Sequence, residues 1–140
     1  MNIALGSDGA CGNNRISVFE EMRMVSILQK VHTLDALCVN YKNAFSMGTA
    51  GGARALDLPI GRLASGYAAD FAAIDLRDLS MQPLSRSGQF LPNLVYSLQP
   101  TALKRVVVNG RVTVADGRLQ LLEDEKLLEQ IRETMEYLES

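Results

Sequence analysis

The sequence of 140 residues has little of what metal sites and disulfide frameworks are built from: one histidine and two cysteines. Cys11 and Cys38 are too few for a thiolate metal site, so reduced thiols and a cytoplasmic location are expected. His32 has no acidic or histidine partner at metal-ligand spacing, so a capping or surface role is favoured over ligation. The chain therefore holds no obvious metal site made of its own nitrogen and sulfur ligands.

Charge of one sign and long apolar runs are also scarce. The net charge of −2 gives no electrostatic footprint for nucleic acid. No apolar run is long enough to cross a membrane, and the N-terminus lacks the basic and apolar regions of a secretory signal. With 47% hydrophobic and 21% charged residues, the composition is that of a soluble globular domain with a sizeable core.

One carboxylate stands out near the N-terminus. The unbroken apolar run Ile3–Leu5 predicts a strand covered on both faces, and Asp8 follows it between Gly6 and Gly9, which allow unusual backbone angles. An acid at the end of such a strand can bind a metal or hold a proton. The alternative is a turn in which Asp8 only accepts hydrogen bonds from nearby amides. Cys11 lies in the same loop, where a buried, inert thiol is favoured over a reactive one.

Helical periodicity follows this loop. Ser17 and Glu20 have capping-box spacing at the start of a predicted helix over 18–30. A second helix is predicted over 34–45 with Thr33 as its cap, and a third over 50–56. The Gly51-Gly52 pair in the third helix favours close packing against a neighbour over a phosphate cradle, because the lysine and hydroxyl of a phosphate loop are absent.

The second half reads as short strands and a final helix. Strands are predicted over 60–63, 70–75, 103–108, 111–115 and 118–121, and residues 76–93 are loop-like. Asn109-Gly110 between two β-branched runs predicts a two-residue hairpin. An amphipathic helix is predicted from Asp124 onward, with acidic residues at its N-terminal end.

Three blocks of the chain, in order, carry a family resemblance. The first is Asp8-Gly-Ala-Cys-Gly-Asn-Asn14 with the helix around Phe19-Glu-Glu-Met-Arg23. The second runs from Met47 to Asp75, and the third is Leu94-Val-Tyr96, then Val106-Val-Val-Asn-Gly-Arg111 and Asp116-Gly117. The chain resembles the C-terminal part of the amidohydrolase superfamily, in particular the metal-dependent aminohydrolases of purines, pyrimidines and triazines. Gly12 and Tyr67 depart from the serine and lysine usual at their positions.

The resemblance implies an α/β fold in three parts. Residues 1–58 would be the last strand and following helices of a TIM barrel, residues 59–122 part of a small flanking β-sandwich, and residues 123–140 a C-terminal helix. Because a lone strand and a bare helix leave open edges and apolar surface, we expect either a homo-oligomer, most simply a dimer, or association with a missing N-terminal portion. The alternative is a compact monomer in which the N-terminal strand refolds against its own chain.

The resemblance also implies a reaction. A divalent metal, zinc or iron, would activate water for deamination or dechlorination of a small-molecule ring, with Asp8 as metal ligand and proton acceptor. The family's other ligands are histidines of earlier strands, so this chain alone is expected to be inactive. Two alternatives are a non-catalytic interaction or oligomerisation module derived from the same fold, and an unrelated small α+β binding domain.

Overall fold

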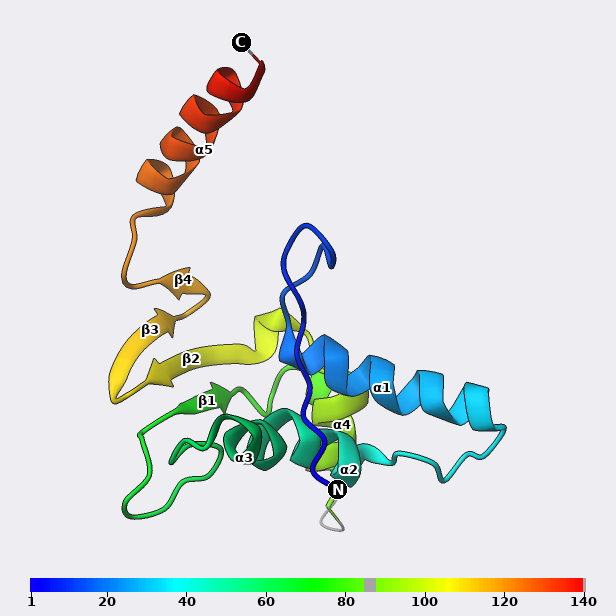
Figure 1. Ribbon diagram of the computed structural model, residues 1–140. Coiled ribbons are helices and arrows are strands. Elements are labelled where there is room, and N and C mark those ends of the chain that lie inside the picture. Colours follow the sequence, from blue (N-terminus) through cyan, green and yellow to red (C-terminus); the bar gives the residue numbers. More distant parts are fainter. Residues whose placement is uncertain (85–87, 140) are drawn as a thin grey trace.

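A computed structural model describes residues 1–84 and 88–139 of the chain (Figure 1). Its helices are α1 (Val18–Thr33), α2 (Tyr41–Ser46), α3 (Gly52–Leu56), α4 (Phe90–Tyr96) and α5 (Asp124–Glu139). Its strands are β1 (Phe71–Ile74), β2 (Leu103–Val108), β3 (Arg111–Ala115) and β4 (Arg118–Leu119). A π-helical turn, Met47–Gly51, joins α2 to α3, and 3₁₀ turns cover Leu79–Met81 and Pro100–Ala102. Figure 1 shows α1, α2 and α4 gathered together, the sheet beside them, and α5 standing apart.

Helix α1 begins where the sequence predicts it and ends later. The Ser17 hydroxyl accepts a hydrogen bond from the Glu20 amide at 3.4 Å, and Leu34 ends the helix in a left-handed conformation at φ 53°. The predicted second helix over 34–45 is wrong for its first seven residues. Asn40, not Thr33, caps α2, since its side chain accepts from the amides of Lys42 and Asn43. Because the Asn40 side chain satisfies these free amides, the helix begins at Tyr41 and not at Leu34.

The core lies between α1, α2 and α4. Met22, Ala44 and Val95 are buried together, with Leu5, Val25, Tyr41, Phe45 and Tyr96 packed around them. Beside this cluster the fully buried Ser26 donates to the Val39 carbonyl at 2.7 Å. Ser26 Oγ also lies 2.8 Å from the Tyr96 hydroxyl, which accepts from Lys30 Nζ at 2.7 Å. Since the Ser26 proton goes to Val39, the Tyr96 hydroxyl donates to Ser26, and every polar group in this network is satisfied.

The network also sets the ionisation of Tyr96. Burial acts to raise the pKa of this phenol, but the hydrogen bond from Lys30, the contact with Ser26 and the Lys30 charge outweigh it, so the pKa lies below its usual range. The Lys30 ammonium also stands 4.9 Å from the centre of the Tyr96 ring, which adds a cation–π contact. Helices α1 and α4 are thereby joined by a polar contact as well as an apolar one.

Small residues allow the close approaches that the sequence suggests. A side-chain carbon at Gly51 would lie 2.5 Å from the Ile3 carbonyl oxygen, and one at Gly48 would collide with Met22. Gly52, by contrast, has open space around it. The close packing expected of the Gly51-Gly52 pair therefore rests on its first member, and the helix runs over Gly52–Leu56 after a π-helical turn.

The sheet is a single four-stranded antiparallel meander with the order β1-β2-β3-β4. The Asn109-Gly110 hairpin is confirmed: both residues have positive φ, 48° and 76°, as the mirror-image turn requires. The strand predicted over 60–63 is wrong, because those residues form bends with no sheet partner. The described chain contributes one sheet, and the second layer that a sandwich needs is not among the residues described.

The strand predicted over Ile3–Leu5 is not formed either. The Leu5 amide donates to the Met47 carbonyl at 3.3 Å, and Asn2 donates to the Gly51 carbonyl at 3.1 Å, but no strand pairs with this segment among the described residues. Ile3 is 47% exposed. An extended segment becomes a sheet strand only beside other strands, and this chain places helices there instead.

Of the remaining predictions, the loop over 76–93 is partly wrong and the C-terminal helix is confirmed. Within 76–93, predicted as a loop, the structure has the 3₁₀ turn at Leu79–Met81 and the start of α4, with Pro92 in the first helical turn where proline is tolerated; residues 85–87 lie outside the described part. The C-terminal helix is confirmed as α5. Over 1–84 and 88–139, no helix has the length and apolar character that a membrane crossing requires.

Candidate active site

Asp8 lies on an exposed loop that leads into α1. Its own backbone takes the left-handed conformation at φ 60°, whereas Gly6 and Gly9 do not need it. Aspartate is among the few residues that tolerate this conformation. Asp8 Oδ1 accepts from the Gly9 amide at 2.7 Å, and a side-chain carbon at Gly12 would lie 3.0 Å from Oδ2. The missing side chain at Gly12 thus leaves Oδ2 accessible.

The loop behind Asp8 is a tight turn tied to α1. The amides of Gly12 and Asn13 both donate to the Gly9 carbonyl, at 3.0 and 2.9 Å. Asn13 Nδ2 then donates to Glu21 Oε1 at 2.8 Å, so the first half of the Asn13-Asn14 pair positions the loop against the helix. This bond was not foreseen, although an acid one turn inside α1 is a usable signal.

Cys11 and His32, the two other residues considered for chemistry, are both exposed to solvent. Cys11 is exposed in the turn and not buried as expected, because the turn projects from the helices. His32 is exposed in the last turn of α1, where a basic group suits the negative end of the helix dipole. Cys38 is half-buried, and neither thiol is in a disulfide.

The donor set does not make a metal site. Zinc needs about four ligands, and iron sites of this chemistry need comparable sets. In the part of the chain that the structure describes, no three His, Cys, Asp or Glu side chains come together. Asp8 can supply one carboxylate, so the remaining ligands of any site that includes it must come from other polypeptide.

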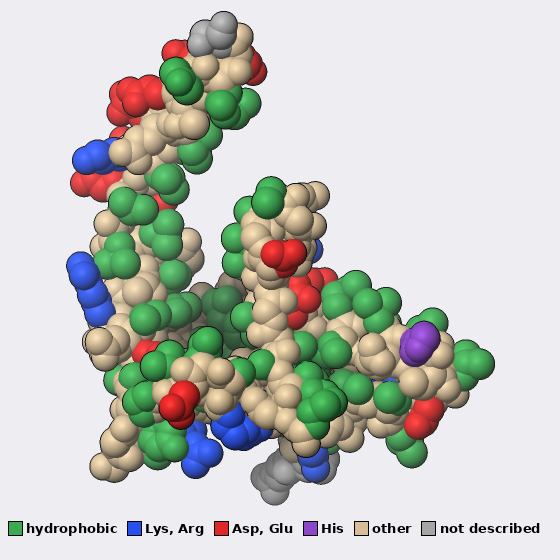
Figure 2. All heavy atoms as spheres, viewed as in Figure 1, with side chains coloured by type: hydrophobic (Ala, Val, Ile, Leu, Met, Phe, Trp, Pro, Cys, Tyr) green, Lys and Arg blue, Asp and Glu red, His purple; other side chains and the backbone are tan. Residues whose placement is uncertain are grey.

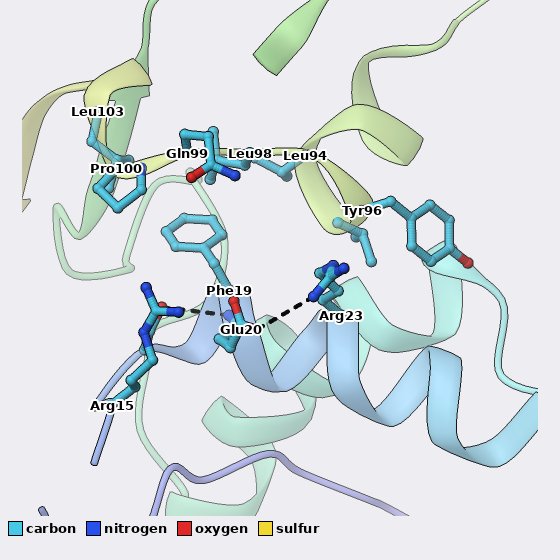
Figure 3. A pocket seen from close by; sticks show the side chains of 12 residues that line it. Arg15, Phe19, Glu20, Arg23, Leu94, Tyr96, Leu98, Gln99, Pro100 and Leu103 are labelled. Carbon is cyan, nitrogen blue, oxygen red and sulfur yellow. Dashed lines mark hydrogen bonds and ion pairs between the residues drawn. The ribbon is translucent and has the colours of Figure 1, made fainter. Parts of the chain in front are cut away.

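A cavity of about 260 Å³ lies between the start of α1 and the connection from α4 to β2 (Figure 3). Phe19 points across it toward Leu98 and Pro100, and Arg23 on its wall pairs with Glu20 at 3.5 Å. Asp8 is not among the residues that line it. The cavity is therefore separate from the Asp8 loop and brings no acid–base pair to it.

Comparison with known families identifies this arrangement of loop, helices and hairpin. The model of the Amidohydrolase family matches residues 1–113. The chain belongs to the amidohydrolase family. The three-block resemblance in the sequence is thereby confirmed, and the loop carrying Asp8 lies within the matched residues.

Curated relatives of this chain include deaminases. A 5-methylthioadenosine/S-adenosylhomocysteine deaminase of Pyrococcus horikoshii is 38% identical over 129 residues, which are 92% of this chain and 30% of the relative. A 5'-deoxyadenosine deaminase of Methanococcus vannielii is 36% identical over 139 residues, covering 99% of this chain and 32% of the relative. The chain spans about a third of the length of the curated relatives it matches.

Solved structures agree on the fold. A zinc-bound adenosine deaminase from Xanthomonas campestris superposes with a TM-score of 0.89 at 29% identity, over 99% of this chain and 31% of that protein. A zinc complex of atrazine chlorohydrolase from Arthrobacter aurescens superposes with a TM-score of 0.80 over 93% of this chain. At 22% identity the second likeness concerns the fold alone. Both are longer proteins of which this chain corresponds to one part.

Proposed function

We propose that this chain is the part of a metal-dependent hydrolase that supplies the Asp8 carboxylate to an active site completed by other polypeptide. The reaction is hydrolysis of a C–N bond outside peptides, and the substrate is an adenine nucleoside that loses its exocyclic amino group. The observation that carries the proposal is the match at 34% identity and above to deaminases of such nucleosides. Dechlorination of a triazine-like ring is disfavoured because the chlorohydrolase likeness is weaker.

Asp8 has the accessibility that its role requires. Water adds its oxygen to the ring carbon, and the amino nitrogen leaves as ammonia, so one proton must move from water to the leaving nitrogen. An ionised carboxylate with one open oxygen, Oδ2, can take that proton and return it. We also assign Asp8 as a metal ligand in the complete enzyme, where zinc or iron would be held chiefly by groups outside this chain. A cytoplasmic location fits the two free thiols.

A chimera tests this proposal. Residues 1–140 replace the matched region of the Pyrococcus horikoshii deaminase, and ammonia release from methylthioadenosine is measured. The chimera should deaminate, and the isolated chain with zinc or iron(II) should not. In the chimera, Asp8→Asn should lower kcat at least about a hundredfold.

Asp116→Asn is the matched control, because Asp116 is another exposed aspartate with positive φ, 49° against 60°. It should leave kcat unchanged. Zinc content measured in each variant separates loss of the metal from loss of the proton acceptor. Turnover by Asp8→Asn close to that of the unaltered chimera would reduce Asp8 to a turn residue.

The alternative is a non-catalytic interaction or oligomerisation module. The observations that favour it are the incomplete donor set and the many large apolar side chains left exposed. A chimera that folds and binds zinc but releases no ammonia would support the module over the enzyme.

A further inference from the structure

Helix α5 carries an apolar stripe that the described residues leave exposed. Leu128, Ile131, Met135 and Leu138 are spaced three, four and three residues apart, the spacing of a coiled-coil seam. They are 53, 49, 49 and 70% exposed, and none of the sixteen residues of α5 is buried. Figure 2 shows hydrophobic side chains along one side of α5 and an open gap between that helix and the N-terminal loop. A seam of this kind is built to face a partner.

The bend that leads into α5 is hollow. A cavity of about 740 Å³ is lined by residues 118–125, including Leu119, Leu121 and Leu122. The last two are 48 and 52% exposed. Because this open hollow includes the first residues of α5, its exposed leucines lie beside the carboxylates of Glu123, Asp124 and Glu125, and both apolar and acidic surface continue from the end of the sheet into the helix.

The charge of α5 argues against pairing with itself. Six carboxylates against two basic side chains give the helix a net charge of −4. Two such helices side by side would repel each other. The positions that flank a coiled-coil seam do not offset this repulsion: Glu125, Arg132 and Glu139 occupy one flank (e), and the uncharged Leu127 and Thr134 occupy the other (g), so no e–g ion pairs can form. Pairing of two copies through α5 is thus disfavoured, and a partner with basic flanks is favoured.

The partner is indicated by the comparison with the zinc-bound adenosine deaminase. That superposition covers 99% of this chain, α5 included, yet only 31% of the longer protein. The projecting position of α5 is thus shared with a protein of which about two thirds lies outside the matched part.

We propose that the α5 seam and the hollow at residues 118–125 bind one segment of the polypeptide that lies outside the matched third. That segment is amphipathic, with an apolar face against the seam and Lys or Arg beside it. This inference rests on the proposed function in one respect: both assume that this chain works together with additional polypeptide. The Asp8 loop and α5 are then both completed by the same additional polypeptide.

Site-specific crosslinking in the chimera tests the seam. A photoreactive phenylalanine analogue replaces Ile131 on the seam or, as control, Glu133 on the opposite side of α5. After irradiation, position 131 should crosslink to a Pyrococcus-derived peptide that carries apolar and basic residues, and position 133 should give little product. If circular dichroism shows that the probe at 131 disturbs folding, Met135 is the second seam position.

Other outcomes overturn the inference. A crosslink from the seam to residues 1–119 of the same chain would mean that α5 folds back, and a crosslink to a second copy would mean a dimer. Absence of any crosslink from both seam positions in a folded chimera would mean an unoccupied seam. The readout does not depend on turnover: crosslinking without ammonia release overturns the proposed function alone, and ammonia release without crosslinking overturns this inference alone.

Discussion

Helices α1 and α5 are both sixteen residues long and both amphipathic, yet one is packed and the other is bare. The apolar side of α1 meets α2 and α4 and buries Met22 and Ser26. The seam of α5 meets no comparable surface, and all four of its residues are about half exposed or more. A periodic pattern therefore predicts which face of a helix is apolar. Whether that face is covered depends on neighbouring elements, which the described residues supply for α1 but not for α5.

The largest expected difference between the two helices lies in their methionines. Met22→Ala, at a site 3% exposed, should lower the free energy of unfolding by about 2–5 kcal/mol, because it leaves a cavity between α1, α2 and α4. Met135→Ala, at 49% exposed, should change it by less than about 0.5 kcal/mol in the isolated chain. Urea unfolding of both variants gives the comparison. Equal losses would mean that α5 is packed in solution.

The N-terminal segment offers a sharper test, from two adjacent glycines. Gly51→Ala brings a methyl group 2.5 Å from the Ile3 carbonyl oxygen and should release residues 2–5 from the helices. Gly52→Ala meets nothing within 4 Å and should stabilise α3 by about 0.5–1 kcal/mol.

Hydrogen exchange at the Leu5 amide, which donates to Met47, is the measurement. It should become faster in Gly51→Ala and stay unchanged in Gly52→Ala. Unchanged exchange in both variants would show that the segment does not pack at Gly51 in solution.

The smallest expected effect is the loss of stability at low pH that comes from Asp75, the residue after β1. Hydrogen bonds from the Arg77 side chain and then its backbone amide, with the Arg77 and Lys104 charges, lower the pKa of Asp75 from 3.8 to about 2. Because the folded-state pKa is depressed, this contribution to stability is complete above about pH 4 and is lost as the pH falls toward 2.

Asp75→Asn and Arg77→Ala should each flatten the fall in urea midpoint between about pH 5 and 2. The change is expected to be modest, because the Arg77 side chain is exposed to solvent, although that of Asp75 is largely covered. An unaltered slope in both variants would assign the acid sensitivity to other carboxylates.

The sequence predicts best what neighbouring residues decide. The Ser17 cap and the Asn109-Gly110 turn form from local backbone chemistry, and both are found. The strand over Ile3–Leu5 needed neighbouring strands that this chain does not bring, and that prediction is wrong. The family could be predicted from three short blocks of residues that occur in the expected order, because these blocks contain the residue types that particular loops and turns require.

The candidate site could be located from the sequence but not described. The pattern places Asp8 after an apolar run, yet glycine was expected to take the left-handed backbone that Asp8 itself adopts. The Ser26–Tyr96 contact joins residues 70 positions apart, and no local pattern encodes such a distance. The bond from Asn13 to Glu21 spans only eight positions, so the acid in the first turn of α1 was the one signal for it. Asp8 as catalytic residue and metal ligand remains a prediction for the chimera to test.

The contact between Ser26 and Tyr96 joins residues 70 positions apart, so it closes a long loop that contains α2, α3 and β1. Once the ends of such a loop are fixed, lengthening it is inexpensive: even a doubling costs only about 0.6 kcal/mol in chain entropy. Residues 64–66 form an exposed turn within this loop. A segment inserted there would lengthen the loop and leave α1 and α4 joined, so this turn is where the fold can acquire new surface at the least expense to its core.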